Sequence, residues 1–392
     1  MDSSGFPLHP ERGFLPATDP AQSLPEAFAP WDQAAAELPK WIAAGRVRRY
    51  LHELPALDVD LLSEGPLLER AMMVLSYFGH AWVWGEAQVA RVLPANIAVP
   101  WCAVAARLGR PPVLSYASYA LYNWRRLDPA GPIALGNVVL LQNFLGGLDE
   151  EWFILVHVDI EARAAPALRG ALSAQQAVSA DDTAGVGHAL EEVATALGAM
   201  NTTLARMPER CDPYIYFNRV RPYIHGWKNN ESLPDGLIYE GVDAYGGEPQ
   251  QFAGETGAQS GIIPVLDGVL RISHADDPLR PYLSEMRRYM PAVHRAFLET
   301  LEAGPDVRQF ALGCGDAEVQ RLFDVCIDGI GEFRSRHLEF AANYVNRQAQ
   351  KTAANPTQVG TGSTPFMRYL RKHRDETAAA RITRNRTTIG GS

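Results

Sequence analysis

The sequence predicts a mainly α-helical protein, in which a large all-helical bundle domain follows a smaller, mostly helical N-terminal domain. Two observations favour this fold class, and a third leaves the structure of one short segment open. Long segments place apolar residues at the three- and four-residue spacing of an amphipathic helix, shorter segments of the same kind precede them, and one short apolar run, 138–141, leaves strand and helix open. The long segments are about 149–177, 182–206, 280–302 and 315–349, and the shorter ones are 66–89, 97–109 and 114–124.

A glycine pair separates the two groups of segments. Gly146 and Gly147 follow the short apolar run and precede the first long helical segment. A chain of 392 residues is also longer than one small hydrophobic core usually supports. We therefore expect an N-terminal arm with a small domain over 1–145 and the large helical domain, with a C-terminal loop and tail, over 146–392.

Helix-breaking and helix-capping residues predict where elements begin and end. Six prolines in the first thirty residues predict an extended arm rather than a helix. Segment 227–275 is rich in Gly, Asp, Asn and Pro and is expected to be a long functional loop. Pro281 is placed for the first turn of one late helix, while Gly315 and Asp316 are placed to break the chain and cap the next.

Charge and composition favour a globular protein that acts on a small molecule. The formal net charge is −9 and 47% of residues are hydrophobic, whereas a nucleic-acid-binding surface needs concentrated Lys and Arg. The one basic run, 368–386, lies in a tail with Thr-, Gly- and Ser-rich stretches and is interpreted as a solvated face or a frayed end. We expect no nucleic-acid partner.

The spacing of the cysteines indicates whether a zinc or iron–sulfur site is expected, and the N-terminal residues indicate the expected cellular location. The four cysteines include no CxxC pair, which zinc and iron–sulfur sites favour. The first residues lack the basic start and apolar core of a signal peptide, and no run of 18 apolar residues occurs. These features predict a cytoplasmic protein with free thiols and no membrane partner.

Two histidines lie on apolar helical faces. His337 is central to a stripe in segment 315–349, and His157 shares a face with Phe153 in segment 149–177. Each imidazole needs a partner, which is either a backbone carbonyl or water in an ordinary core, or a metal. Facing helices of a bundle build cofactor sites in this way, and haem needs only one protein ligand where a bare metal would lack ligands. The pattern alone leaves both interpretations open.

From about residue 72 to 372 the sequence resembles the indoleamine 2,3-dioxygenase family, in its bacterial-type members. The matching stretches keep the family's order. They are VWG at 83–85, VLPANIAVPWC at 92–102, YASYALYNW at 116–124, HGWKNN at 225–230, DGLIYEG at 235–241, FAGETGAQS at 252–260, RRYMPAVHRAFL at 287–298, FRSRHL at 333–338 and GTGST at 360–364.

The resemblance implies roles for four residues. His337 matches the proximal histidine that binds the iron of haem b, and Arg334 matches an arginine that pairs with a haem propionate; a solvated helix charge is the alternative for Arg334. Arg221, before Pro222, matches the arginine that binds the substrate carboxylate, and its backbone is expected outside helical geometry. His157 falls where vertebrate members carry a distal serine and tryptophan 2,3-dioxygenases a histidine; a core histidine bonded to a carbonyl is its alternative.

The remaining matches predict a substrate pocket. They are Tyr116, Tyr119, Phe153, Tyr216, Phe217, Thr256 and, in a mobile lid over the substrate amine, Thr361. Ordinary core packing is the alternative for Tyr216 and Phe217. Tyr119 and Tyr216 are bulkier or more polar than the usual family residues and leave the identity of the substrate open.

The resemblance implies a haem-dependent dioxygenase. Ferrous haem b would bind O2, and both oxygen atoms would insert across the indole C2–C3 bond of tryptophan or a related indoleamine to give an N-formylkynurenine-type product. An electron donor would keep the iron ferrous, and the protein is expected to be a monomer. Two alternatives stay open, namely another haem-dependent oxidation or rearrangement of a tryptophan derivative on the same scaffold, and a non-enzymatic O2-binding protein.

Overall fold

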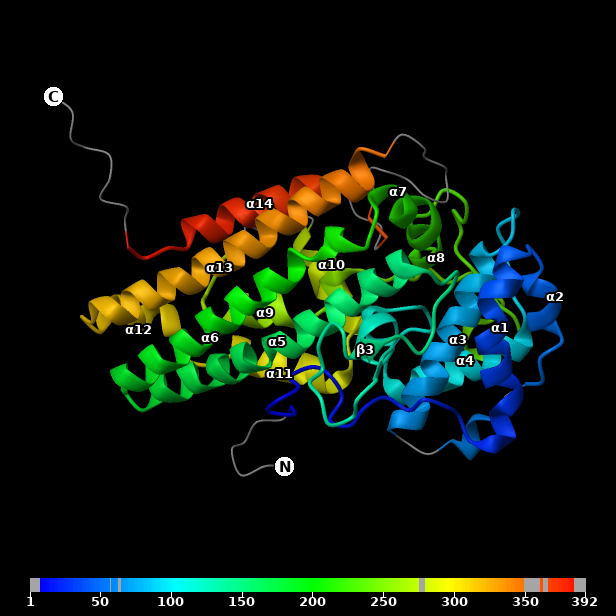
Figure 1. Cartoon of the computed structure of the whole chain (residues 1–392), viewed down its shortest axis with the longest axis horizontal. Helices are drawn as coiled ribbons and strands as arrows, with labels where there is room; N and C mark the ends of the chain where they lie inside the picture. Colours follow the sequence, from blue (N-terminus) through cyan, green and yellow to red (C-terminus); the bar gives the residue numbers. More distant parts are fainter. Residues whose placement is uncertain are drawn as a thin grey trace.

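The computed structural model describes residues 8–56, 58–62, 65–274, 279–348, 360–361 and 366–383, and helices form most of it (Figure 1). The predicted mainly α-helical fold class is confirmed. The early helices are α1 (Ala29–Ala43), α2 (Val47–His52), α3 (Pro66–Trp84) and α4 (Ala95–Leu108). The later ones are α5 (Leu148–Ser179), α6 (Thr183–Leu204), α7 (Pro213–Ile215), α8 (Arg221–Ile224), α9 (Ile262–Val269), α10 (Leu279–Met286), α11 (Ala292–Glu302), α12 (Val307–Gly313), α13 (Ala317–Ala341) and α14 (Phe366–Ala379).

Short irregular helices and strands connect these elements. π-helical turns cover Ala117–Leu121, Tyr216–Val220 and Ala342–Asn346. 3-10 turns cover Glu26–Phe28, Val59–Leu61, Met207–Glu209, Asp243–Tyr245, Gly257–Gln259 and Arg287–Tyr289. Strand β1 (Val92–Leu93) pairs in parallel with β4 (Ile238–Tyr239), and β2 (Arg125–Arg126) pairs antiparallel with β3 (Val138–Val139).

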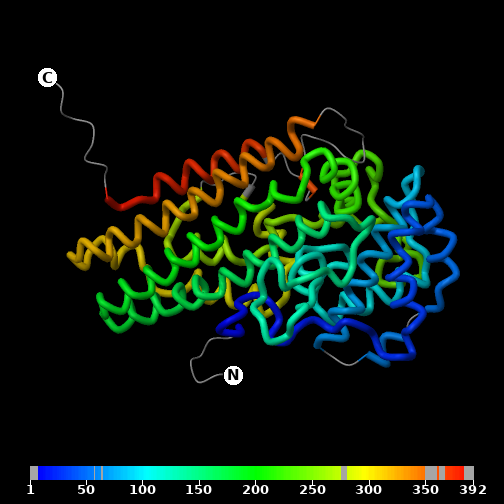
Figure 2. The backbone as a smooth tube through the Cα atoms, viewed as in Figure 1, coloured from blue at the N-terminus to red at the C-terminus, as the bar shows by residue number. Residues whose placement is uncertain are grey.

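Four long helices form the body of the molecule. Helices α5 and α6 are joined by three residues and lie side by side, α13 packs on α6, and α14 runs along α13 (Figures 1 and 2). The predicted cap of α13 is confirmed, since the Asp316 carboxylate accepts the Glu318 and Val319 N–H groups at 2.8 and 3.2 Å. Gly315 turns the chain at a φ of 73°, which an L side chain rarely adopts.

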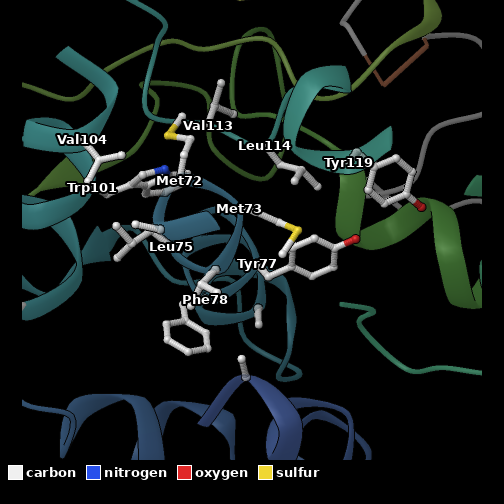
Figure 3. Packing of buried hydrophobic residues seen from close by; sticks show 14 of the residues in the cluster. Met72, Met73, Leu75, Tyr77, Phe78, Trp101, Val104, Val113, Leu114 and Tyr119 are labelled. Atoms are coloured by element: carbon white, nitrogen blue, oxygen red, sulfur yellow. The ribbon is translucent and has the colours of Figure 1, made fainter. Parts of the chain in front are cut away.

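Two clusters of buried apolar residues fill the interior. The first joins α1, α3, α4 and the segment after α8, and Figure 3 shows Trp101 and Tyr77 within it. A Cβ atom at Gly79 of α3 would lie 2.2 Å from the Trp101 ring, so α3 and α4 approach each other through that glycine. The second cluster joins α5, α6, α9, α11 and α13. The domain division at 145/146 stays a prediction.

Several predicted helices end earlier than expected or are interrupted. Segment 280–302 is not one helix: Met290 is extended before Pro291, and this break separates α10 and the following 3-10 turn from α11. Segment 66–89 is helical only to Trp84, and segment 114–124 contains only a π-helical turn. The run 138–141 contributes strand β3 rather than a helix, and loop 227–275 contains the unexpected helix α9.

The C-terminal basic run is not a frayed end over residues 368–379, because α14 packs along α13. Thr377 of α14 is fully buried and contacts the guanidinium of Arg334, and Arg381 lies 3.5 Å from the carboxylate of Asp324. Residues 384–386 of that run lie outside the described residues. None of the described helices is long and apolar enough to cross a membrane.

Candidate active site

A mostly apolar cavity lies between α5, α13, α14 and the loop that leads into α9. Helix α5 contributes Phe153 and His157, α13 contributes Arg334 and His337, and α14 contributes His373. Of the residues predicted for the site, those lining the cavity are Tyr116, Phe153, His157, Tyr216, Arg221, Thr256, Arg334, His337 and Thr361. The fold therefore brings predicted site residues into one cavity although Tyr116 and Thr361 are more than 240 positions apart in the chain.

Two predicted pocket residues do not line this cavity. The ring of Tyr119 lies behind Phe153, with 6.3 Å between ring centroids, and its hydroxyl is buried without a hydrogen-bond partner among the described residues. The ring of Phe217 lies 5.5 Å from the guanidinium carbon of Arg221. Each of the two therefore contacts a residue that lines the cavity and does not line the cavity itself.

His337 differs from the ordinary core histidines of the protein. Both ring nitrogens of His80 are satisfied, one beside the Tyr223 carbonyl oxygen at 2.7 Å and one accepting the Leu114 N–H at 3.0 Å. The ring of His337 makes no such bond to a described residue, and its accessible part borders the cavity. Although the His337 side chain is exposed where it borders the cavity, desolvation by the protein packed around the ring, with the nearby His157, lowers its pKa to about 4, so its imidazole is neutral and can donate a lone pair to a metal.

His157 faces the same cavity from α5 and also makes a bond within its own helix. Its Nδ1 lies 2.7 Å from the Phe153 carbonyl oxygen, and because a carbonyl only accepts, Nδ1 carries the proton. Nε2 of the neutral ring is then left as an acceptor. Burial lowers the pKa of His157, which keeps the ring neutral near pH 7. His157 thus makes the hydrogen bond to a carbonyl that is expected of a core histidine, and it also borders the cavity.

Arg334 is neither solvated nor unpaired. Its side chain is 8% exposed, and its Nη2 lies 2.5 Å from Asp267 Oδ2 in α9. Thr377 of α14 accepts a second hydrogen bond from Nη1. The alternative of a solvated helix charge is therefore wrong, since the guanidinium is held at the cavity wall by two neighbouring helices.

Arg221 adopts helical geometry, contrary to the expectation from Pro222. Its φ and ψ are −55° and −37°, and it is the first residue of α8, directly after the π-helical turn Tyr216–Val220. Proline fits the first turn of a helix because its missing N–H would have no partner there, and this accommodates the pair. Arg221 is 1% exposed, and burial lowers its pKa to about 10, so it remains a cation at neutral pH.

Two buried glutamates at the site were missed by the sequence analysis. Glu255 lines the cavity, and burial raises its pKa to about 8. Glu161 accepts hydrogen bonds from the Tyr116 hydroxyl at 2.9 Å and the Ser260 hydroxyl at 2.8 Å, and burial raises its pKa to about 7. The sequence contained features that could have identified both residues as part of the site. Glu161 lies one helical turn after His157, and Glu255 is the charged residue of FAGETGAQS.

A close backbone contact places Glu255 beside the end of α8. A Cβ atom on Gly254 would lie 2.2 Å from the Gly226 nitrogen, so only glycine allows this approach. The Glu255 N–H donates to the Ile224 carbonyl at 3.1 Å, and its own carbonyl accepts the Thr361 hydroxyl. Residues 362–364, the rest of the predicted lid, lie outside the described residues.

Comparison with known proteins connects this cavity with a family. A family profile described as "Indoleamine 2,3-dioxygenase" matches residues 2–380. The chain belongs to this family. Mouse indoleamine 2,3-dioxygenase 1 is 36% identical over 374 residues, which cover 92% of this chain and 91% of the relative. Human indoleamine 2,3-dioxygenase 2 is 32% identical, over 96% and 95%, and the enzyme of Saccharomyces cerevisiae is 30% identical, over 96% and 93%.

Membership of the indoleamine 2,3-dioxygenase family confirms the class of protein that the sequence predicted. The protein is a haem-dependent dioxygenase of the tryptophan type, and haem with its iron is its cofactor. The predicted small-molecule substrate and O2 agree with this class. The bacterial-type label finds no support in these mammalian and fungal relatives.

Proposed function

We propose that the protein inserts both atoms of O2 across the indole C2–C3 bond of tryptophan or a related indoleamine and releases an N-formylkynurenine-type product. The observation that carries this proposal is one apolar cavity that holds His337 and His157 on different helices together with the buried cation Arg221. A neutral imidazole, an apolar chamber and a carboxylate-binding arginine are what a haem dioxygenase of an amino acid requires of its protein.

The residues of the cavity fit haem. His337 offers a neutral nitrogen without a hydrogen-bond partner among the described residues, in surroundings that include Phe333 and Phe340. Arg334 lies one helical turn before it, where a propionate could join its ion pair with Asp267. When bound, haem supplies the iron that activates O2. We assign His337 as the protein ligand and Arg334 as the propionate partner.

Arg221 and Glu255 suit the two charges of an α-amino acid. Both side chains line the cavity. The guanidinium of Arg221 would bind the substrate carboxylate through two hydrogen bonds, and Glu255, once ionised, would bind the ammonium group. Phe153 and Tyr216, whose ring centroids are 4.6 Å apart, would pack against the indole. Tyr116 and Thr256 complete the lining.

His157 would orient the indole without removing its proton. With Nδ1 donating to the Phe153 carbonyl, Nε2 can accept a hydrogen bond from the indole N–H. Its lowered pKa makes His157 a weak base, so positioning is the role that its surroundings favour. Thr361 would close the cavity over the substrate amine through its bond to the Glu255 carbonyl.

Further proposals concern the setting of the reaction. An electron donor would keep the iron ferrous, and a monomeric chain in the cytoplasm would suit both the charge of −9 and the free cysteines among the described residues. The second candidate function is a haem-dependent oxidation or rearrangement of a substituted tryptophan. Tyr216, one of the two tyrosines that leave the identity of the substrate open, lines the cavity and favours this candidate, because its hydroxyl would offer a partner to a polar substituent on the indole.

The test mixes ferrous protein with O2 and L-tryptophan and follows the absorbance of N-formylkynurenine. D-Tryptophan and tryptamine serve as comparisons. We expect catalytic turnover with L-tryptophan or with one of the two comparison compounds. Reversible O2 binding without product from any of them would favour an oxygen carrier, and turnover restricted to a substituted tryptophan would favour the second candidate.

A further inference from the structure

Three metal-ligating side chains converge at the junction of α14 with the segment after α9. They are His274, His373 and Glu376, and one ligand atom from each lies within 4.8 Å of the others. His373 and Glu376 stand three residues apart on α14 and so share one face of that helix. His274 comes from a segment about a hundred positions earlier. His373 also borders the cavity that holds His337, but none of the three residues has a role in the proposed reaction.

Hydrogen bonds orient His274 as a ligand. Its Nε2 lies 3.1 Å from Asp267 Oδ2, and a carboxylate there receives the ring proton. Nδ1 lies 2.7 Å from Glu376 Oε2, and because a carboxylate only accepts, this contact needs a proton on Nδ1 in the metal-free protein, a proton that a metal ion held between the two atoms would replace. A carboxylate that holds the outer nitrogen of a metal-binding histidine is a common feature of metal sites, because it fixes the tautomer and raises the basicity of the ligand.

The other two ligands are also available in suitable form. The ring of His373 stacks on His274 with 4.1 Å between centroids and an interplanar angle of 23°. An imidazole without a second proton has one ring nitrogen with a lone pair, so His373 can serve as a ligand beside His274. The second oxygen of Glu376 lies 3.5 Å from Lys372, which leaves Oε2 directed toward His274.

We propose that His274, His373 and Glu376 bind one Zn²⁺ ion, with Asp267 as the outer carboxylate that orients His274. Two imidazoles and one carboxylate are a ligand set that zinc uses in proteins, with water in the fourth position. Metal–ligand bonds of about 2.0–2.2 Å require ligand atoms closer together than 4.8 Å, and a small rotation of the half-buried side chains supplies this. The ion would fasten α14 to the segment after α9.

This placement links the ion to the wall of the cavity. Asp267 contacts both His274 and Arg334, and Arg334 lies three residues before His337. The alternative is a metal-free arrangement in which a protonated His274 bridges two carboxylates, and surroundings that raise the pKa of His274 suit that state as well. Metal content distinguishes the two arrangements without reference to turnover, so the test is independent of the proposed function.

The experiment measures zinc bound to the haem-loaded protein. Wild type is incubated with excess Zn²⁺, dialysed, and analysed for zinc, iron and protein. His373→Ala and the nearly isosteric Glu376→Gln are compared with His188→Ala, which removes an exposed histidine of α6. We expect about one zinc per chain in wild type and in His188→Ala, as the site has one ion's ligands, and at least a tenfold weaker retention in the other two.

Helical circular dichroism confirms that each variant is folded, and Glu376→Gln keeps the test valid if His373→Ala is unstable. X-ray absorption at the zinc edge should report imidazole nitrogen together with oxygen and no sulfur. Zinc bound equally by all four proteins would place the ion elsewhere and overturn the proposal. Wild type that retains no zinc would leave only the hydrogen-bonded cluster and would overturn it as well.

Discussion

His157 and His337 border one cavity from helices α5 and α13, and the proximity of His157 contributes to the lowered pKa of His337. When two imidazoles face the same cavity, a positive charge on one ring repels a positive charge on the other, which lowers the pKa of both rings. Each ring is therefore poised as a neutral nitrogen. In the proposed reaction the two rings have different tasks, since His337 would bind the haem iron and His157 would orient the substrate.

His337→Ala should lose most of the haem and all turnover. No described residue beside His337 on α13 can replace its nitrogen, since Phe333 and Phe340 flank it in the cavity. The purified variant should show a haem-to-protein absorbance ratio far below that of wild type, while the control His188→Ala keeps it. A variant with full haem and a histidine-type ferrous spectrum would contradict the assignment.

Arg221→Ala should weaken the binding of substrates that carry a carboxylate by about 2–4 kcal/mol, because one partner of a desolvated charge pair is removed. The measurement compares dissociation constants of tryptophan and tryptamine by titration of the haem spectrum. Tryptamine lacks the carboxylate and should bind nearly as before. Equal losses for both compounds would instead place Arg221 in the structure of the site.

Glu255→Gln should have the opposite selectivity. We expect tryptamine to bind about 1–3 kcal/mol more weakly, while indole-3-propionate, which has no ammonium group, is unaffected. The pKa of Glu255 is raised to about 8, so below this pH the free protein must lose a proton to bind the ammonium. Tryptamine affinity in wild type should therefore rise as pH increases through about 8, and in Glu255→Gln it should not. A pH profile shared by both proteins would exclude this role.

His157→Ser should keep haem and measurable activity, with a loss of about 1–3 kcal/mol in transition-state stabilisation for one buried hydrogen bond. The ferric spectrum, or its pH dependence below the usual imidazole pKa of about 6.5, should change as well, since the lowered pKa places protonation of His157 there. Ferric spectra that match wild type from about pH 5 to 8, with unaltered tryptophan kinetics, would remove His157 from the catalytic site.

The apolar periodicity of the sequence was enough to predict those helices whose capping residues and apolar spacing agree with their packing in the fold. Helices α5 and α6 lie close to their predicted bounds and α13 begins close to its predicted start, because apolar spacing and capping residues such as Asp316 specify them locally. Helix α13 ends earlier than predicted, at Ala341, where the π-helical turn Ala342–Asn346 begins. Irregular elements were missed, since a π-helical turn such as Tyr216–Val220 depends on tertiary contacts. Pro291 was the exception, for its break of 280–302 was readable in the sequence.

The sequence predicted best those site residues whose type is unusual at its position. A histidine on an apolar stripe and an arginine in a family motif are rare enough to stand out, and both reach the cavity. Partners across the fold could not be read from spacing. Asp267 of α9 meets Arg334 of α13 through an ion pair between residues 67 positions apart, and Glu255 lies beside the end of α8 through the close contact of Gly254 with Gly226.

The most direct test of the central claim is the origin of the oxygen atoms in the product. Ferrous protein is mixed with L-tryptophan and O2 labelled with heavy oxygen in ordinary water, and the first product is analysed by mass spectrometry before the formyl group hydrolyses. A dioxygenase incorporates both labelled atoms into one molecule of N-formylkynurenine. A product that carries one labelled atom or none would contradict dioxygen insertion across the indole bond.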